Sequence, residues 1–459
     1  MRDKKRRSSV DMTQGSPVRL ILSFSMPVLL GAAFQQIYTL CDTMIAGHFL
    51  GDGALAAIGA SASIYSMMLM FANGMGNGCG IVLGKYFGMG DVKQVRRCTW
   101  AMTMLTLAVT VVVTLGMLLG CDALLRWQNA PASIFDDAQV YMTILFAGFA
   151  MTVAYNASAA FMRALGNSRT ALYFLIIASG LNLVLDVLMV VAFGWGVAGA
   201  ALATVIAQGI SAVLSILYIL RKFAAYMPGK DELRPDGRLW SEMATTGLSM
   251  GLMNSVYAIG SVTMQGAING LGETVLTAHT TARKILVVMM QPASALATAL
   301  AAFTSQNRGA GEWARIRRAY RNGVVMVSIW AVIAAAVLFG LGEGLVRGLS
   351  GTADQEVLRL AVLNLCINAP LFLPEGVLVI TRQTLQALGM RIAPILVSCI
   401  ELVMKVLFAW FAVPLWGYVG ASWAEPSTWV VCAVFILGVF YFNRKKLFGD
   451  LNDQAAKNF

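Results

Sequence analysis

Long apolar segments, separated by short polar connections, occupy almost the whole chain. Their approximate limits are residues 19–47, 55–84, 98–121, 138–162, 170–193, 196–220, 243–269, 275–303, 320–342, 357–380, 392–413 and 418–442. A membrane-spanning helix needs about 20 mostly apolar residues, and each of these twelve segments supplies them. The strict alternation that marks the strands of a membrane barrel is missing from the sequence. The pattern therefore predicts an all-α polytopic membrane protein with twelve transmembrane helices.

The most polar connection in the sequence follows the sixth apolar segment. It covers residues 221–240 and carries both acidic and basic side chains, together with a proline at Pro235. We therefore predict an N-terminal six-helix bundle at residues 1–220, a cytoplasmic linker at 221–240 and a C-terminal six-helix bundle at 241–459.

Short glycine-containing motifs recur in the two predicted bundles at a nearly constant offset. The first two pairs have the same offset and the third a slightly larger one: Gly51-Asp52 with Gly272-Glu273, Trp195-Gly196 with Trp416-Gly417, and Ala164-Leu165-Gly166 with Ala387-Leu388-Gly389. Six spans is an even number, so both copies cross the membrane in the same direction. The sequence thus predicts two bundles related by a pseudo-two-fold axis along the membrane normal, which is typical of transporters with alternating access.

Composition and charge distribution fix the expected orientation. The chain is 58% hydrophobic and 12% charged, with a formal net charge of +11. Basic residues gather in the N-terminal tail and in the connections after the second and eighth segments, for example Lys4, Arg6, Lys93, Arg97, Arg315 and Arg318. Because such residues concentrate on the cytoplasmic side, we predict a multi-pass protein of the cell membrane with both termini in the cytoplasm. We do not expect a nucleic-acid partner.

Three polar side chains stand out within the apolar segments of the N-terminal half. Asn182 and Asp186 are four residues apart and share one helix face, and Asp42 lies in the first segment. An intramembrane carboxylate is costly and usually marks an ion or substrate path. If the two acids face one small cavity, they favour binding of a proton, or of Na⁺ together with neutral oxygens. The alternative for Asp42 is a solvated position near the membrane interface.

The sequence offers little support for an enzyme. The two histidines, His48 and His279, are far apart, and the seven cysteines are scattered without a CxxC pair. We find no metal-ligand cluster, nucleotide-binding glycine loop or Ser/His arrangement. We therefore expect no catalytic residues and no cofactor, and no bound metal beyond possible Na⁺ at the cation site. The coupling ion would be H⁺ or Na⁺.

Several motifs, in this order and with this duplication, resemble the multidrug and toxic compound extrusion (MATE) transporters. The resemblance covers essentially the whole chain. Its carriers are Gly47-His48-Phe49-Leu50-Gly51, Leu55-Ala56-Ala57-Ile58-Gly59, Arg163-Ala164-Leu165-Gly166-Asn167-Ser168, Gly196-Val197-Ala198-Gly199-Ala200, and Ser305-Gln306-Asn307-Arg308-Gly309.

The resemblance implies twelve helices in two bundles and export of amphipathic, often cationic compounds driven by inward H⁺ or Na⁺. It also implies a cation site in the N-terminal bundle. Matched residue by residue, that site falls on Asp42, Asn182, Asp186 and Thr204, with Tyr38 as a nearby aromatic residue. Pro27 matches a proline that bends the first helix. Some members carry an acid in the seventh helix, which is missing here, and a second coupling site is therefore not expected.

Other charged side chains within the C-terminal apolar segments are candidate substrate contacts. They are Glu375, Glu401, Glu425 and Arg283. Glu401 and Lys405 are four residues apart, so an ion pair within one helix is the main alternative role for Glu401. Arg283 either lines a cavity or extends toward the membrane surface.

These observations lead to two hypotheses about function. The first is a cation-coupled antiporter that exports small organic compounds or drugs by alternating access. The alternative is a flippase for lipid-linked oligosaccharides built on a related fold, with Arg283, Lys284 and Lys405 available for a pyrophosphate. Under either hypothesis the expected partners are a small molecule and the lipid bilayer, and we expect a monomer.

Overall fold

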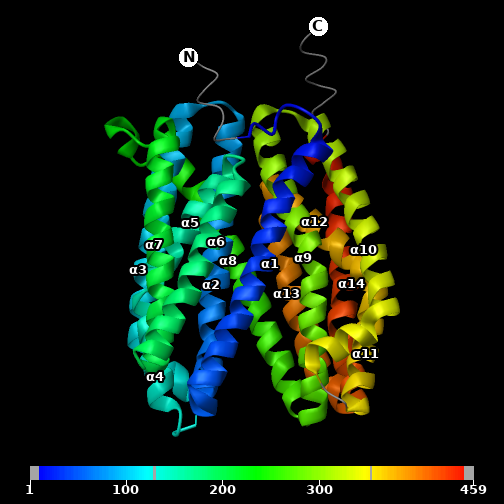
Figure 1. Cartoon of the computed structure of the whole chain (residues 1–459). Helices are drawn as coiled ribbons and strands as arrows, with labels where there is room; N and C mark the ends of the chain where they lie inside the picture. The colour runs from blue at the N-terminus through cyan, green and yellow to red at the C-terminus, as the bar shows by residue number, and fades with distance from the viewer. Residues whose placement is uncertain (1–9, 128–130, 352–353, 449–459) are drawn as a thin grey trace. The chain divides into compact units, whose positions relative to one another are not determined.

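A computed structural model describes residues 10–127, 131–351 and 354–448, and it is shown in Figure 1. The tail residues Lys4 and Arg6, used above to predict orientation, lie outside the described residues. Within the described part every regular element is helical. The first half contains α1 (Pro17–Phe49), α2 (Gly51–Gly88), α3 (Val92–Trp127), α4 (Phe135–Ala147), α5 (Phe149–Ala164), α6 (Ser168–Asp186), η2 (Val187–Ala192) and α7 (Gly196–Lys222).

The second half repeats this order after two short helices in the polar connection. It contains η3 (Ala224–Tyr226), η4 (Lys230–Leu233), α8 (Gly237–Asn269), α9 (Glu273–Ala310), α10 (Trp313–Ser350), α11 (Gln355–Asn368), η5 (Ala369–Leu371), α12 (Phe372–Ala387), α13 (Ile392–Leu407), η6 (Phe408–Ala412) and α14 (Val413–Phe448). The prediction of an all-α fold is confirmed.

Each of the twelve predicted segments coincides with one helix or with a broken pair of helices. The fourth segment is the pair α4 and α5, which bend by 46° at their junction. The eleventh segment covers α13 and η6, and the twelfth lies within α14. The chain turns between the two segments at Gly417, near the start of α14, where φ is +56°. A residue with a side chain rarely adopts positive φ, so glycine allows the turn.

The backbone geometry repeats in the same way as the motifs. Gly166 and Gly389 both have φ of +85°, and Gly51 and Gly272 have φ of +81° and +99°. The two π-helical segments η2 and η6 begin at equivalent positions of the repeat, Val187 and Phe408. The recurring glycines therefore mark positions where both halves need the same left-handed backbone.

Contacts divide the chain into two compact units, each described here by itself. Unit 1 comprises Met1–Asp11 and Pro27–Gly251, and unit 2 comprises Met12–Met26 and Leu252–Phe459. The helices α1 and α8 each run from one unit into the other. The predicted bundles at residues 1–220 and 241–459 describe the sequence repeat, which is a different division from these two contact-based units. That division stays a prediction.

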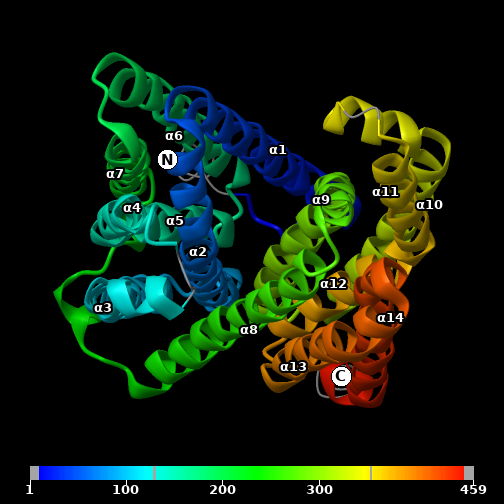
Figure 2. The same cartoon turned by 90° about the horizontal axis from the view of Figure 1, so that it is seen from below.

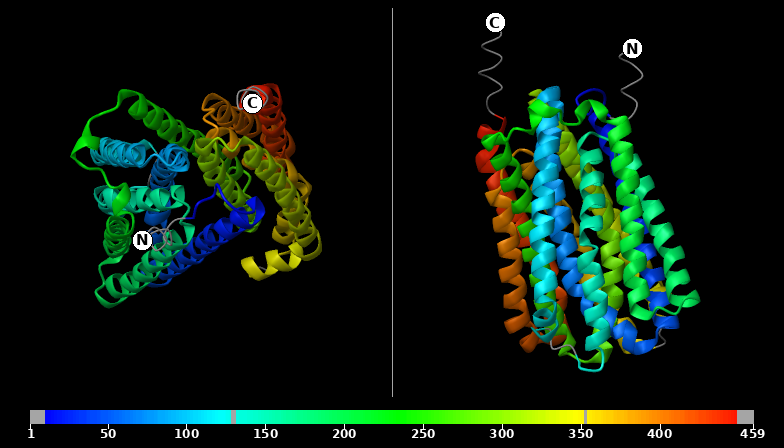
Figure 3. Two further views of the ribbon diagram at one scale, coloured as in Figure 1. Left: turned by 90° about the horizontal axis from the view of Figure 1, so that it is seen from above. Right: turned by 90° about the vertical axis from the view of Figure 1, so that its left-hand side faces the viewer.

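In unit 1, α5 lies between α2 and α7 and also contacts α3 and α6, as the view along the helices in Figure 2 shows. The blue to green helices of this unit run side by side in the right-hand view of Figure 3. Two apolar clusters form the core, one around Leu83 and Met162 and the other around Met142 and Phe146. In unit 2, α9 contacts α10, α11 and α12, while α14 contacts α12 and α13.

Candidate functional site

The C-terminal end of α6 positions two of the predicted site residues. Asn167 caps the helix, because its side-chain oxygen accepts a hydrogen bond of 3.0 Å from the backbone N–H of Thr170. Asn182 and Asp186 lie one turn apart on the face that points into unit 1, and only 3% and 2% of their surfaces are exposed. Asp186 is the last α-helical residue before the π-helical turn η2.

A glycine-rich reversal then brings α7 back along α6. Gly194 and Gly196 have φ of +68° and +58°, which permits the tight turn between η2 and α7. The returning helix carries Thr204, whose hydroxyl donates to the carbonyl oxygen of Ala200 at 3.2 Å and accepts from the Asn182 amide at 3.5 Å. The reversal and the packing of α7 along α6 therefore bring Thr204 opposite Asn182.

The first helix completes the cluster. Tyr38 and Asp42 lie one turn apart on α1, after Pro27, and both are half-buried. The phenol of Tyr38 lines one small cavity together with the hydroxyl of Thr204, and the carboxyl of Asp42 lies close to the Asp186 carboxyl. The structure thus brings together all five residues predicted for a cation site, from three helices of unit 1. Pro27 lies inside α1, which remains helical on both sides of it.

A small cavity lies beside this cluster. It holds about 20 Å³ and is lined by Tyr38, Asn182 and Thr204 together with Gln35, Leu175, Ala178, Ser179 and Gln208. A volume of roughly 10–15 Å³ admits one water-sized probe, so the cavity suits a single small species. The amides Gln35 and Gln208 were missed by the sequence analysis. Each lies one helical turn from a predicted residue, and that spacing was the available signal.

Three buried acceptor atoms of the cluster receive no hydrogen bond from the part of the chain that the structure describes. Within the described residues, neither carboxylate oxygen of Asp186 receives a hydrogen bond, and the same holds for the side-chain carbonyl oxygen of Asn182. Buried acceptors without donors are costly. A proton shared between Asp42 and Asp186 supplies one donor, and Na⁺ would be coordinated by these oxygens, which are hard ligands suited to such an ion. The residues present therefore fit either cation.

Unit 2 carries a different cluster of charges. The guanidinium of Arg283 pairs with the carboxylate of Glu425, and the Lys405 ammonium lies 3.7 Å from the same carboxylate. The ammonium also donates to the Ser261 hydroxyl at 2.9 Å and lies 4.0 Å from the centre of the Tyr257 ring. Two cations thus share one carboxylate.

The predicted ion pair between Glu401 and Lys405 is wrong. Glu401 instead pairs with Arg382 of α12 at 3.3 Å, while Lys405 points to Ser261 and Glu425. The physical reason is that other helices supply opposite charges closer than the neighbour four residues away. Nearby in α12, Glu375 is 2% exposed, and its Oε2 atom has no hydrogen-bond partner within the described residues.

A known protein family matches both halves of the chain. The model of the MatE family matches residues 27–188 and, a second time, residues 249–411. The spacing of the two starting positions, 27 and 249, agrees with the repeat seen in the motifs. Together the matches cover more than two thirds of the chain.

Curated relatives match over most of their length. The probable multidrug resistance protein YpnP of Bacillus subtilis (strain 168) is 29% identical over 309 residues, which is 67% of this chain and 68% of that protein. The multidrug export protein MepA of Staphylococcus aureus (strain NCTC 8325 / PS 47) is 20% identical over 445 residues, with 95% and 97% of the two chains covered.

Solved structures share the fold. A MOP superfamily transporter from Pyrococcus furiosus Vc1 (DSM3638) superimposes with a TM-score of 0.86 at 22% identity, covering 96% of this chain and 98% of that one. A MATE structure in the bent conformation gives a TM-score of 0.87 at 22% identity, with 97% and 98% covered. These neighbours support the predicted twelve-helix arrangement. The chain, a multi-pass membrane protein, belongs to the MatE family, the MATE transporters that its motifs resemble.

Proposed function

We propose that this transporter is a cation-coupled antiporter that exports small amphipathic organic compounds, and that Asp42 and Asp186 bind the coupling ion. The observation that carries the proposal is the buried Asp186 carboxyl, which receives no hydrogen bond from the described residues and lies close to the half-buried carboxyl of Asp42. The names of the relatives, which refer to multidrug resistance and multidrug export, support organic compounds as the cargo.

The proposed cycle follows from the oxygen atoms of the cluster. Binding of H⁺ or Na⁺ gives the Asp186 oxygens the partner that the described residues do not provide, and the nearby Asp42 carboxyl can share it. This lowers the cost of keeping both carboxyls together and favours a closed cluster around Tyr38, Asn182 and Thr204. Loss of the ion leaves two adjacent carboxylates that repel each other, which favours separation of α1 from α6. Coupling arises because the ion and the cargo then prefer different arrangements.

Orientation and substrate contacts belong to the same proposal. The protein would lie in the cell membrane as a monomer, with both termini in the cytoplasm and without a nucleic-acid partner. Glu375, Glu401, Glu425 and Arg283 are proposed to contact the cargo. Glu401 and Glu425 already hold basic partners, so they have less attraction for a cationic compound than isolated carboxylates would have.

The test uses purified protein in liposomes with a pH gradient and a Na⁺ gradient imposed separately. Uptake of a panel of cationic, neutral and anionic amphiphiles is measured under each gradient. We expect uphill transport of some compounds with one gradient and none without a gradient. Uptake that is the same with and without either gradient would overturn cation coupling.

A second candidate function is transport of lipid-linked oligosaccharides. The observation in its favour is that Arg283 and Lys405 share the single carboxylate of Glu425, which leaves an excess positive charge in unit 2. A pyrophosphate is a suitable partner for such a charge. Translocation of a fluorescent lipid pyrophosphate in the same liposomes, without transport of any amphiphile in the panel, would favour this function.

A further inference from the structure

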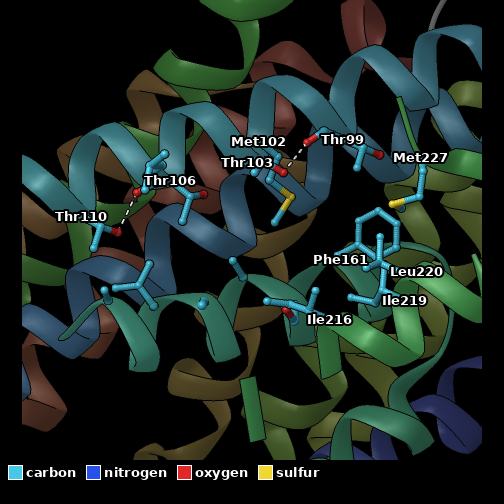
Figure 4. Close-up of a pocket in the computed structure, with 16 residues that line it drawn as sticks. Thr99, Met102, Thr103, Thr106, Thr110, Phe161, Ile216, Ile219, Leu220 and Met227 are labelled. Atoms are coloured by element: carbon cyan, nitrogen blue, oxygen red, sulfur yellow. Dashed lines mark hydrogen bonds between the residues drawn. The ribbon is translucent and has the colours of Figure 1, made fainter. Parts of the chain in front are cut away.

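Unit 1 contains a second and much larger cavity, away from the carboxyl cluster. It has a volume of about 350 Å³ and lies between α3, α5 and α7 (Figure 4). None of the five predicted cation-site residues lines it. For scale, an engineered apolar cavity of about 150 Å³ stays dry and binds benzene. The cavity therefore has room for an elongated apolar ligand.

The wall formed by α3 is less polar than its sequence suggests. Thr99, Thr103, Thr106 and Thr110 follow one helix face, as Figure 4 shows. Three of the hydroxyls donate to carbonyl oxygens of their own helix: Thr99 to Val95, Thr103 to Thr99 and Thr110 to Thr106, at 2.7–2.9 Å. These three hydroxyls are therefore engaged within the helix, whereas the Thr106 hydroxyl has no hydrogen-bond partner within the described residues. The opposite wall is apolar, with Phe161 from α5 among its buried residues.

The cavity is a groove that opens at an exposed apolar rim. Leu107 is 55% exposed, Ile216 41% and Leu220 49%, and all three line it. In helices that span a membrane, such a rim meets acyl chains. From Thr99 to Thr110 the groove follows α3 for about 16 Å at 1.5 Å per residue. This length corresponds to about half of a 30 Å hydrocarbon core, the depth of one leaflet.

One end of the groove is basic. Leu220 and Met227 line this end, and Leu220 is directly followed by Arg221 and Lys222, which are both exposed. Within the part of the chain that the structure describes, neither Arg221 nor Lys222 forms an ion pair.

The neighbouring basic residues on α3 are already paired. Arg96 lies 3.6 Å from Glu232 and donates to the Ala225 carbonyl oxygen, and Arg97 lies 3.6 Å from Asp236. These contacts hold the connection after α7 against α3. They leave Arg221 and Lys222 as the positive charges available at the groove end.

We propose that this groove binds one acyl chain of an anionic phospholipid, with the headgroup phosphate at Arg221 and Lys222. The apolar walls and the length of one leaflet fit the chain, and the basic end fits the headgroup. The site is independent of the proposed transport cycle, because it shares no lining residue with the cation cluster. A bound lipid would fill the space between α3 and α7 and hold these helices in register with α5.

The groove volume is tested by filling it. In the double substitution Ala154→Phe and Ala157→Phe, both residues line the groove. The matched control is Ala108→Phe, an exposed position on α3 that does not line it. Native mass spectrometry of the detergent-purified proteins, titrated with phosphatidylglycerol, should show one tightly held lipid for wild type and the control. The filled variant should bind at least tenfold more weakly, and equal binding would overturn the proposal.

The basic end is tested with Arg221→Gln and Lys222→Gln in the same titration. Wild type should prefer phosphatidylglycerol to phosphatidylcholine of identical chains, and the preference should fall by about fivefold for each residue removed. Equal affinity of wild type for the two lipids would contradict the headgroup assignment.

A third measurement covers the case in which the filled variant fails to fold. Phosphatidylglycerol with a photoactivatable group in its acyl chain is cross-linked to wild type. We expect labelled peptides from residues 99–110 and 216–227. Labelling confined to other helices would show that the lipid lies elsewhere and would overturn the site.

Discussion

At the scale of single residues, the two halves place side chains of different charge at equivalent positions of the repeat. Thr204 of unit 1 follows Trp195 at the same distance along the chain as Glu425 of unit 2 follows Trp416, so the repeat aligns them. Thr204 lies among the oxygens of Asn182, Tyr38 and the carboxyl pair, whereas Glu425 holds Arg283 and Lys405. The repeat therefore does not duplicate the proposed cation site of unit 1, and the asymmetry comes from side chains.

We predict that Glu425→Gln destabilises unit 2 strongly. The substitution leaves the buried ammonium of Lys405 and the one-third-exposed guanidinium of Arg283 without their shared carboxylate. A buried charge left without its partner, here that of Lys405, costs about 3 kcal/mol or more. The matched control is Glu343→Gln, which breaks the exposed pair with Arg347, where the side chains are 59% and 55% exposed. Its cost is about 0–1 kcal/mol.

Thermal unfolding of the purified variants in detergent measures the difference. A clear fall in melting temperature is expected for Glu425→Gln and almost none for Glu343→Gln. Similar melting temperatures for the two would show that the cluster in unit 2 contributes little to stability.

Residue-scale predictions from the sequence succeeded where a helix period sufficed. Asn182 and Asp186 share a face by spacing, and Asp42 was singled out as an acid in an apolar segment. Placing Tyr38 and Thr204 beside them needed the family resemblance. The partner of Glu401 could not be found from spacing, because Arg382 comes from another helix and only the packing of α12 against α13 brings it within 3.3 Å.

At the scale of helices, glycine controls how closely two elements approach. Gly78 lies in α2 where this helix crosses the first part of α8 in unit 1. A Cβ atom added at Gly78 would lie 2.6 Å from the carbonyl oxygen of Thr246 and 2.7 Å from Cα of Gly247. Because backbone atoms cannot move aside like a flexible side chain, α2 and α8 must separate to admit even a methyl group.

We predict opposite effects for two glycine-to-alanine substitutions. Gly78→Ala should destabilise the protein by about 1–3 kcal/mol through overpacking. Gly116→Ala, in the interior of α3 with open space around it, should stabilise it by up to about 1 kcal/mol, since alanine favours helix. Melting temperatures of the two variants are compared with wild type. A Gly78→Ala protein as stable as wild type would contradict the close approach of the two helices.

The sequence predicted the helices better than their interruptions. All twelve apolar segments are helical, since length and hydropathy determine that property. The junction of α4 and α5 at Gly148 and the π-helical segments η2 and η6 were not predicted. These features depend on the space left by neighbouring helices: a Cβ at Gly148 would lie 2.2 Å from the Val205 side chain. Apolar periodicity carries no information about such contacts.

At the scale of the whole molecule, the repeat and the basic residues together predict the topology. The connection after α2 should face the cytoplasm, and the start of α4 should face the outside. In a background with all cysteines replaced, Asp91→Cys and Asp137→Cys place one thiol in each region. A membrane-impermeant maleimide applied to intact cells should label only Asp137→Cys, and should label Asp91→Cys after permeabilisation. The reverse pattern would invert the proposed orientation.

The two halves share backbone features, although the charged side chains within their helices differ. Glycines with positive φ and π-helical segments recur in both halves, so the repeat supplies two similar scaffolds. Only the first scaffold carries the adjacent acids Asp42 and Asp186. The proposed ion coupling therefore belongs to unit 1, and unit 2 is free to differ in charge.

The most direct test of this claim is gradient-driven transport by Asp186→Asn in liposomes. Asp137→Asn, which removes an exposed acid from the same unit, is the matched control. The variant should accumulate no compound under the gradient that drives wild type, while it still exchanges compound at equilibrium, because asparagine keeps the shape but not the titratable charge. The control should match wild type. Uphill accumulation by Asp186→Asn at the wild-type level would contradict the assignment of the coupling site.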